Sequence, residues 1–253
     1  MKEQLYTIPL NDAMNAQDEC PFCFIERNIE QNQIDFVLGA GASYMESDIR
    51  EMTDKAGFCR THFKKMHEYG NTLGNGWILK THYKRTIEEM EKAFSEYKPT
   101  KTSFKDRFRK TAQSENPIGI WIREKEASCY ICKHFEDTYA RYLDTFFYLY
   151  KKDEAFRQKV ADSKGFCLHH FADLCDGADQ KLSDKDRETF YNTLLPLMEE
   201  NFKRIYEDVA WLIEKFDYRN QDADWKNSKD AVKRAMQKLK GGYPADPPYQ
   251  MNR

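Results

Sequence analysis

Apolar residues recur along the chain at steps of three and four, the spacing that places side chains on one face of an α-helix. The first such stripe consists of Leu79, Tyr83, Ile87, Met90, Phe94 and Tyr97. The second consists of Phe135, Tyr139, Tyr142, Phe146 and Tyr150. The third consists of Phe190, Leu194, Met198, Phe202, Ile205, Val209, Ile213 and Phe216. Alternation typical of β-strands is scarce, so the pattern predicts an all-α fold in which the three stripes face the core.

Two local signals concern the helix of the third stripe. Ser183 and Asp186 have a spacing similar to that of a capping box, which marks the start of a helix. Pro196 lacks a backbone N–H, so we expect it to kink this helix or to divide it in two.

A cysteine-containing pattern occurs twice in the chain. The sequence CPFC at residues 20–23 is followed by GFCRTHF at residues 57–63, and CYIC at residues 129–132 is followed by GFCLHHF at residues 165–171. The CxxC motifs are offset by 109 residues and the GFCxxHF motifs by 108. One residue of slippage over such a length indicates an internal duplication.

The spacing of these motifs suits a metal ion. Zinc prefers four tetrahedral nitrogen and sulfur ligands, usually supplied as two close pairs. CxxC places both sulfurs on one side of a tight turn, and CxxH at the start of a helix places Cys and His on one face. Gly57 and Gly165 precede the second pair, where glycine permits the positive φ between one helix and the next.

We predict one Cys3His site in each repeat and two zinc ions per chain. The first site consists of Cys20, Cys23, Cys59 and His62. The second consists of Cys129, Cys132, Cys167 and His170, with His169 as the alternative to His170. The competing interpretation is that the cysteines are small buried apolar residues, and we favour it for Cys175, which has no counterpart in the first repeat. Iron–sulfur clusters are disfavoured because they generally take all-thiolate ligands.

The repeat predicts how the chain is organised. Residues 1–112 and 113–240 form two helical modules, each organised around one metal site, and residues 241–253 form a poorly ordered tail. We expect the modules to dock against each other, because the third apolar stripe is longer than its own module can cover.

Composition restricts the compartment and the partners. The formal net charge of −2 gives no overall attraction to nucleic acid or to an anionic membrane. The N-terminal apolar stretch is too short and broken for a signal peptide, and no uncharged apolar run could span a bilayer. We therefore expect a cytoplasmic protein without a membrane partner, whose seven cysteines stay reduced.

Two segments are locally basic. Residues 98–110 carry six basic side chains against one acid, with Phe104 and Phe108 between the charges, and residues 226–240 have a similar balance. Aromatic rings among basic residues would suit stacking on nucleic acid, although a solvated linker or helix face is the commoner explanation.

The tandem CxxC…GFCxxH arrangement, together with LYTIP at residues 5–9, resembles an uncharacterised bacterial family, domain of unknown function 6062. The resemblance covers nearly the whole chain, and its motifs are fairly specific. It implies the same eight Cys and His residues as the positions that the family shares, and it implies no activity.

Closed sites and the absence of recognisable catalytic motifs favour a non-enzymatic, zinc-binding module with an unknown protein partner. The alternative is a thiol-redox enzyme or a redox or metal sensor, because CPFC resembles a glutaredoxin-like active site and CxxC at a helix start lowers a thiol pKa. The missing βαβ context and the absence of proline from CYIC weigh against redox chemistry. Nucleic-acid binding through the basic linker is the third hypothesis.

Overall fold

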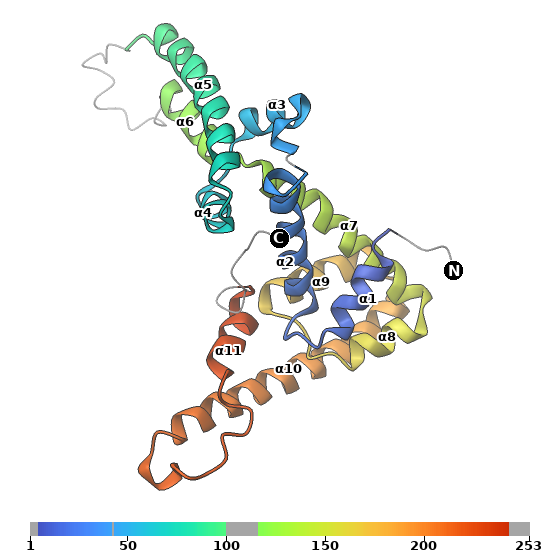
Figure 1. Ribbon diagram of the computed structural model, residues 1–253. Helices are drawn as coiled ribbons and strands as arrows, with labels where there is room; N and C mark the ends of the chain where they lie inside the picture. The colour runs from blue at the N-terminus through green and yellow to red at the C-terminus, as the bar shows by residue number, and fades with distance from the viewer. Residues whose placement is uncertain (1–4, 42, 100–115, 243–253) are drawn as a thin grey trace, which may run out of the picture. The chain divides into compact units, whose positions relative to one another are not determined.

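The computed structural model describes residues 5–41, 43–99 and 116–242 (Figure 1). Within them the chain forms eleven α-helices, two short 3-10 helices and no strand, which confirms the predicted all-α class. No described helix combines the length and apolarity needed to cross a bilayer. The helices are α1 (Thr7–Asn15), α2 (Pro21–Leu38), η1 (Ser43–Met45), α3 (Ser47–Ala56), α4 (Arg60–Tyr69), α5 (Thr72–Glu96), α6 (Pro117–Ala127), α7 (Tyr130–Lys152), α8 (Glu154–Ala161), α9 (Leu168–Lys181), α10 (Asp184–Glu214), η2 (Tyr218–Asn220) and α11 (Ala231–Lys240).

The order of helices follows the sequence repeat. A short helix, α1 or α6, precedes a long helix that begins in the CxxC motif, α2 or α7. A short helix, α3 or α8, then leads to α4 or α9, which begins directly after the cysteine of GFCxxH. A second long helix follows, α5 or α10. Helix α11 comes after α10 and has no counterpart after α5 among the described residues.

The described residues form two compact units. The first unit contains residues 5–30 and 136–242, and the second contains residues 31–99 and 116–135. The dividing points fall inside α2 and α7, so each unit takes segments from both repeats. The units therefore differ from the two expected modules, whose boundary lies outside the described residues, as does most of the expected tail.

Aromatic rings fill the core of the first unit. Phe22 of α2, Phe146 of α7 and Phe166 before α9 are fully buried, and their ring centroids lie 5.6 to 6.3 Å apart. Tyr142 and Tyr150 of α7 are buried beside them. Large rings bury much apolar area per residue, which stabilises a unit of this size. The second predicted stripe is thus confirmed as core where it lies in this unit.

The core of the second unit joins the end of α2 to α4 and to the starts of α5 and α7. It consists of Ile34, Val37, Leu38, Phe58, Met66, Tyr69, Ile78, Cys129, Tyr130 and Ile131. The hydroxyl of Tyr69 donates a hydrogen bond to Asp35 at 2.6 Å, so this buried polar group is paired.

Helix α10 runs without interruption through Pro196, so of the two predicted outcomes, a kink or a division, the division does not occur. Leu194 and Met198, on either side of the proline, are buried and hold both halves against the core. The predicted helix start is confirmed, because Ser183 is the N-cap and its side chain accepts a hydrogen bond from the N–H of Asp186. The third stripe is core only in its first part, since Ile213 and Phe216 are exposed.

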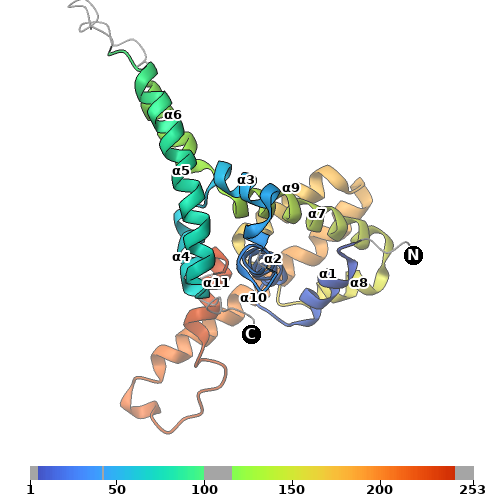
Figure 2. The same ribbon diagram turned by 45° about the horizontal axis from the view of Figure 1, so that its top comes forward.

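The first stripe, on α5, is largely exposed, which corrects the prediction that it forms core. Tyr83, Ile87 and Phe94 face solvent. Figures 1 and 2 both show α6 running beside α5, and α3 also packs against α5. These two helices contact the other side of α5, and only Leu79, Met90 and Tyr97 of the stripe are partly buried.

Candidate metal centres

Four fully buried side chains meet in the first unit and form what we call the first cluster. Cys20 and Cys23 stand at the start of α2, Cys167 occupies the N-cap position of α9, and His170 lies in the first turn of α9. The Nδ1 atom of His170 lies 3.3 Å from the sulfur of Cys20, 3.6 Å from that of Cys23 and 3.1 Å from that of Cys167. The sulfurs of Cys23 and Cys167 are 3.8 Å apart.

The second cluster, in the second unit, has the same composition. It consists of Cys59 at the N-cap of α4, His62 in the first turn of α4, and Cys129 and Cys132 at the start of α7. Nδ1 of His62 lies 3.2 Å from the sulfurs of Cys59 and Cys129 and 3.4 Å from that of Cys132. The sulfurs of Cys59 and Cys132 are 3.8 Å apart, and these two residues are only half-buried.

Each cluster combines residues of both repeats, which corrects the pairing predicted from the sequence. CPFC meets the CxxH motif of the second repeat, and CYIC meets that of the first. The physical reason is the helix that begins at CPFC. Helix α2 has 18 residues, so it extends about 27 Å, and its far end packs in the same core as α4. The CxxH motif of the same repeat therefore lies at the wrong end of α2 to meet CPFC.

Both clusters have dimensions that fit a tetrahedral zinc ion. Bonds of about 2.3 Å to sulfur and about 2.1 Å to nitrogen imply edges of roughly 3.8 Å between sulfurs and roughly 3.6 Å between sulfur and nitrogen. The sulfur–sulfur distances of 3.8 Å match, and the nitrogen–sulfur distances of 3.1 to 3.6 Å lie at or slightly inside the expected edge. The distances exclude disulfides, whose sulfurs are about 2.05 Å apart, and all seven cysteines are free.

The two nitrogens of His170 have different surroundings. Nδ1 faces the three sulfurs, whereas Nε2 lies 3.1 Å from a carboxylate oxygen of Glu26 on α2. A carboxylate at the second nitrogen orients the ring and increases the basicity of a ligating histidine. Burial by itself would lower the pKa of His170, but Cys167, Cys20 and Glu26 raise it to about 12. The side chain of His169, the alternative ligand, is 65% exposed and lies outside the first cluster.

Glycine is required before both CxxH motifs. Gly57 has φ of +61° and Gly165 has φ of +73°, which confirms the predicted positive φ. A Cβ atom on Gly57 would lie 2.7 Å from the ring of His82, and one on Gly165 would lie 3.0 Å from the sulfur of Met198. Any side chain at either position would therefore combine backbone strain with a steric conflict.

Direct hydrogen bonds join the two ligand loops of the second cluster. The N–H of Tyr130 donates to the carbonyl of Gly57 at 2.9 Å. The hydroxyl of Ser128 donates to the carbonyl of Ala56 at 2.5 Å. These bonds hold Ala56 and Gly57 against Ser128 and Tyr130, the residues that flank Cys129. The two ligand loops are therefore positioned by direct contacts between them.

The first cluster is joined by a residue of α11, the helix that has no counterpart after α5 among the described residues. Pro21 stands where the second repeat has Tyr130, and proline has no N–H to donate. Instead, Nζ of Lys238 on α11 donates to the carbonyl of Glu19 at 2.5 Å and to that of Lys164 at 2.6 Å. Lys238 is only 1% exposed. Helix α11 thus supplies the connection between the two ligand loops that proline prevents.

Further contacts place the end of α11 beside the first cluster. The amide of Gln237 donates to Asp18 at 2.6 Å, and the same carboxylate oxygen accepts the N–H of Cys20 at 3.0 Å. A Cβ atom on Gly241 would lie 3.7 Å from the sulfurs of Cys23 and Cys167. The end of α11 therefore covers the cluster closely.

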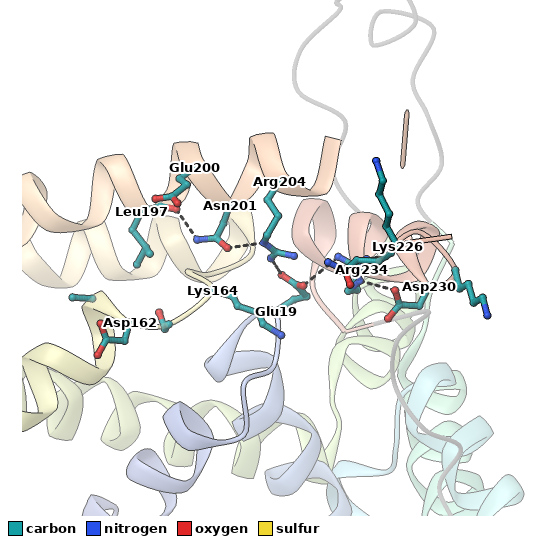
Figure 3. A pocket seen from close by; sticks show the side chains of 14 residues that line it. Glu19, Asp162, Lys164, Leu197, Glu200, Asn201, Arg204, Lys226, Asp230 and Arg234 are labelled. Atoms are coloured by element: carbon teal, nitrogen blue, oxygen red, sulfur yellow. Dashed lines mark hydrogen bonds and ion pairs between the residues drawn. The ribbon is translucent and has the colours of Figure 1, made fainter. Parts of the chain in front are cut away.

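The carboxylate of Glu19, directly before Cys20, is 4% exposed and surrounded by cations (Figure 3). Arg204 of α10 donates to it at 2.5 Å, Lys238 lies 3.3 Å away, and Arg234 of α11 lies 3.6 Å away. Burial opposes the charge, but the hydrogen bond from Arg204 and the charge of Lys238 keep the pKa of Glu19 lowered. Glu19, Arg204 and Arg234 line a cavity of about 740 Å³, and their ion pairs tie α10 and α11 to the CxxC loop.

The thiols of a cluster do not ionise independently. In the first cluster, the hydrogen bond with Cys167 raises the pKa of Cys23. In the second, burial raises the pKa of Cys129, but the hydrogen bond with His62 outweighs it and lowers that pKa to about 6, while burial and Cys129 raise the pKa of Cys132. Three adjacent thiolates repel one another, so a bound cation would remove this conflict.

Sequence reasoning found the eight cluster residues but missed the residues that support them. Glu26 lies three positions after Cys23 on α2, and this helical spacing is a signal that could have identified it. Lys238 and Gly241 lie far from every motif in the sequence, and no local signal identifies them. Cys175 lies outside both clusters.

A model described as a family of unknown function (DUF6062) matches residues 1–246. No curated protein and no solved structure matches the chain.

Proposed function

The chain belongs to this family of unknown function, and we propose from its own residues that it is a zinc-stabilised helical protein that binds a protein partner and catalyses no reaction. The observation that carries the proposal is the pair of four-residue clusters, each with three thiols and one imidazole. Three sulfurs and one nitrogen form a donor set that favours zinc over calcium, magnesium or manganese. Mixed ligation also favours zinc over an iron–sulfur cluster.

Four protein ligands support a structural role for the metal. They fill the tetrahedral coordination of zinc and leave no position for substrate or water. Bound zinc would act as a cross-link, because the ligands of the first cluster are up to 150 positions apart and those of the second up to 73. Closing loops of this length has an entropic cost that a metal clip offsets.

An exposed apolar patch supports a protein partner. Tyr206 and Ile213 of α10, Phe216 and Tyr218 are 68 to 80% exposed and lie near the end of α10. Clustered large apolar side chains at a surface usually mark an interaction site. These residues belong to the same unit as the first cluster. A zinc ion in that cluster would help to hold the helices of this unit in place.

Elemental analysis of the full-length protein, purified without chelators, tests the metal sites. We expect two zinc ions per chain, and one zinc ion in each of the variants Cys20→Ser and Cys129→Ser. A metal-free wild-type chain that remains folded would contradict the proposal. The interaction role is tested separately by Phe216→Asp, which should reduce partner recovery while zinc content stays unchanged.

A redox function is the second candidate, and the second cluster favours it. Cys59 and Cys132 are half-buried, and the pKa of Cys129 is lowered to about 6 by His62 despite burial. Mild peroxide distinguishes the candidates when free thiols are counted with and without a chelator. A structural site should lose thiols only after chelation, whereas a redox site should form a reversible disulfide in the zinc-loaded protein.

Nucleic-acid binding through the basic linker concerns residues that lie almost entirely outside the described ones. In the second basic segment, Lys238 is buried and Arg234 is paired with Asp208 at 2.8 Å. Lys226 lies 4.2 Å from the ring of Trp211. With these three of its six cations engaged within the chain, the segment has only half of its basic side chains left for a phosphate backbone.

A further inference from the structure

Helix α5 carries five exposed large apolar side chains along one side. Their exposed fractions are 70% for Leu73, 39% for Trp77, 63% for Tyr83, 44% for Ile87 and 50% for Phe94. At 3.6 residues per turn they fall within an arc of roughly 120°. We call them the α5 stripe. A continuous apolar stripe on a soluble helix indicates burial against another element.

The rest of its own unit packs on the other side of α5. Glu89 of α5 forms an ion pair with Lys125 of α6, and the hydroxyl of Thr81 donates to Asp54 of α3 at 2.6 Å. Figures 1 and 2 show α6 lying along α5 in both views. Neither helix covers the α5 stripe.

Charged side chains on the same side of α5 are divided between its two halves. Lys80 and Lys84 precede Ile87, whereas Glu88 and Glu91 follow it. Lys84, Glu88 and Glu91 form no ion pair within the described residues, so their charges are available to a partner. This side of α5 is therefore basic toward the start of the helix and acidic toward its end.

We propose that the α5 stripe binds the α5 stripe of a second copy of the chain, in antiparallel orientation about a twofold axis. Tyr83, Ile87 and Phe94 of the stripe and the half-buried Met90 beside them follow one another at steps of four, three and four, the spacing of residues in a two-helix seam. In this pairing Ile87 meets Met90 of the second copy, and Tyr83 meets Phe94 of the second copy. Lys84 then lies opposite Glu91 of the second copy, and twofold symmetry makes this ion pair twice.

The charge pattern selects the orientation and the occupant. A parallel pair would place Lys84 and Glu91 beside Leu79 and Thr86 of the second copy, so neither charge would gain an ion partner. Antiparallel pairing joins Lys84 to Glu91 of the second copy, so the surface is complementary to itself. An unrelated partner would need an apolar stripe with the same division of charge, whereas a second copy supplies it by symmetry. This inference rests on α5 alone and requires neither the metal sites nor the partner proposed above.

Charge reversal tests the pairing in the full-length, zinc-loaded protein. Sedimentation over a range of chain concentrations should show a reversible dimer for the wild type. Lys84→Glu and Glu91→Lys should each weaken it about tenfold, because each turns two rim ion pairs into repulsions. Lys92→Glu, the same substitution outside the stripe, is the matched control and should leave the dimer unchanged. Ile87→Asp should abolish dimerisation.

The decisive measurement mixes the two single variants. An equimolar mixture of Lys84→Glu and Glu91→Lys chains should form a heterodimer with near wild-type affinity, since one ion pair is the wild-type pair and the other is restored with reversed sign. The double variant should likewise recover the homodimer. A wild-type monomer at all concentrations would overturn the proposal and indicate that another part of the chain or another protein covers α5. A dimer insensitive to Ile87→Asp would also overturn it, because a different surface would then hold the copies together. Zinc content and circular dichroism, measured on each sample, separate these outcomes from loss of a metal site.

Discussion

Replacing Lys238 with Met removes the ammonium group that joins the two ligand loops of the first cluster, while the new side chain still fills the space. The ammonium donates to the carbonyls of Glu19 and Lys164, and both bonds lie in a buried environment. In the variant these carbonyls lose their shared donor. One direct bond between the loop before Cys20 and the loop before Cys167 remains in the variant, because Nζ of Lys164 donates to the carbonyl of Gln17 at 2.7 Å.

The size of the effect follows from these contacts. Two buried carbonyls left without a donor cost about 1–3 kcal/mol each. The carboxylate of Glu19 keeps its hydrogen bond from Arg204, so the variant leaves no unpaired buried charge. Burial lowers the pKa of Lys238, although Glu19 raises it, so removal of this charge also returns part of the cost of burying it. We therefore expect a net loss of about 3 kcal/mol, or roughly 100-fold in zinc affinity if the loss falls wholly on the metal site.

Competition with a chromophoric chelator measures this change. In the Lys238→Met variant one zinc ion should be lost at lower chelator concentration, while the other is held as in the wild type. Lys240→Met is the matched control, because Lys240 is exposed on the same helix. If both variants release zinc like the wild type and unfold at the same urea concentration, the proposed role of Lys238 is wrong.

Four further perturbations test the sites. Gly165→Ala should lower the free energy of unfolding by about 2 kcal/mol in urea titrations, because it adds strain at positive φ and a contact with a buried sulfur. Ser128→Ala should cost about 1 kcal/mol and weaken zinc binding only at the second cluster, as read by chelator competition; an effect on both ions would contradict the assignment. Glu26→Gln should weaken one zinc ion about tenfold, since His170 loses its carboxylate partner, and an unchanged affinity would exclude that role. Cys20→Ser and Cys59→Ser, although in one repeat, should each remove a different ion, so native mass spectrometry of the double variant should find no zinc; a double variant that retains one ion would refute the exchange between repeats.

The exchange of ligands between repeats has a consequence for stability. Neither repeat contains a complete cluster by itself, because each supplies a CxxC pair to one site and a CxxH pair to the other. Zinc at either site would hold together segments that are far apart in the chain. Loss of one ion should therefore loosen parts of both repeats, unlike the loss of a site from an independent module.

Much of this protein was determined by local sequence alone. Helical periodicity predicted the all-α class because the spacing of apolar residues depends only on the geometry of one helix. Two short motifs identified the eight Cys and His residues, since CxxC and CxxH place their side chains within a single turn. The positive φ of Gly57 and Gly165 was predictable for the same reason.

Only the tertiary structure decided which pairs of ligands meet. The repeated motifs are alike, so the sequence favoured pairing the nearer motifs, whereas the length of α2 and the packing of its far end against α4 carry CPFC away from the CxxH of its own repeat. The role of Lys238 was equally hidden, because it depends on how α11 packs beside Cys20 and Cys167. The exposed stripe of α5 and the buried stripe of α7 have the same periodicity. Amphipathic spacing indicates that a helix has an apolar face, but the element that covers this face comes from a distant part of the chain.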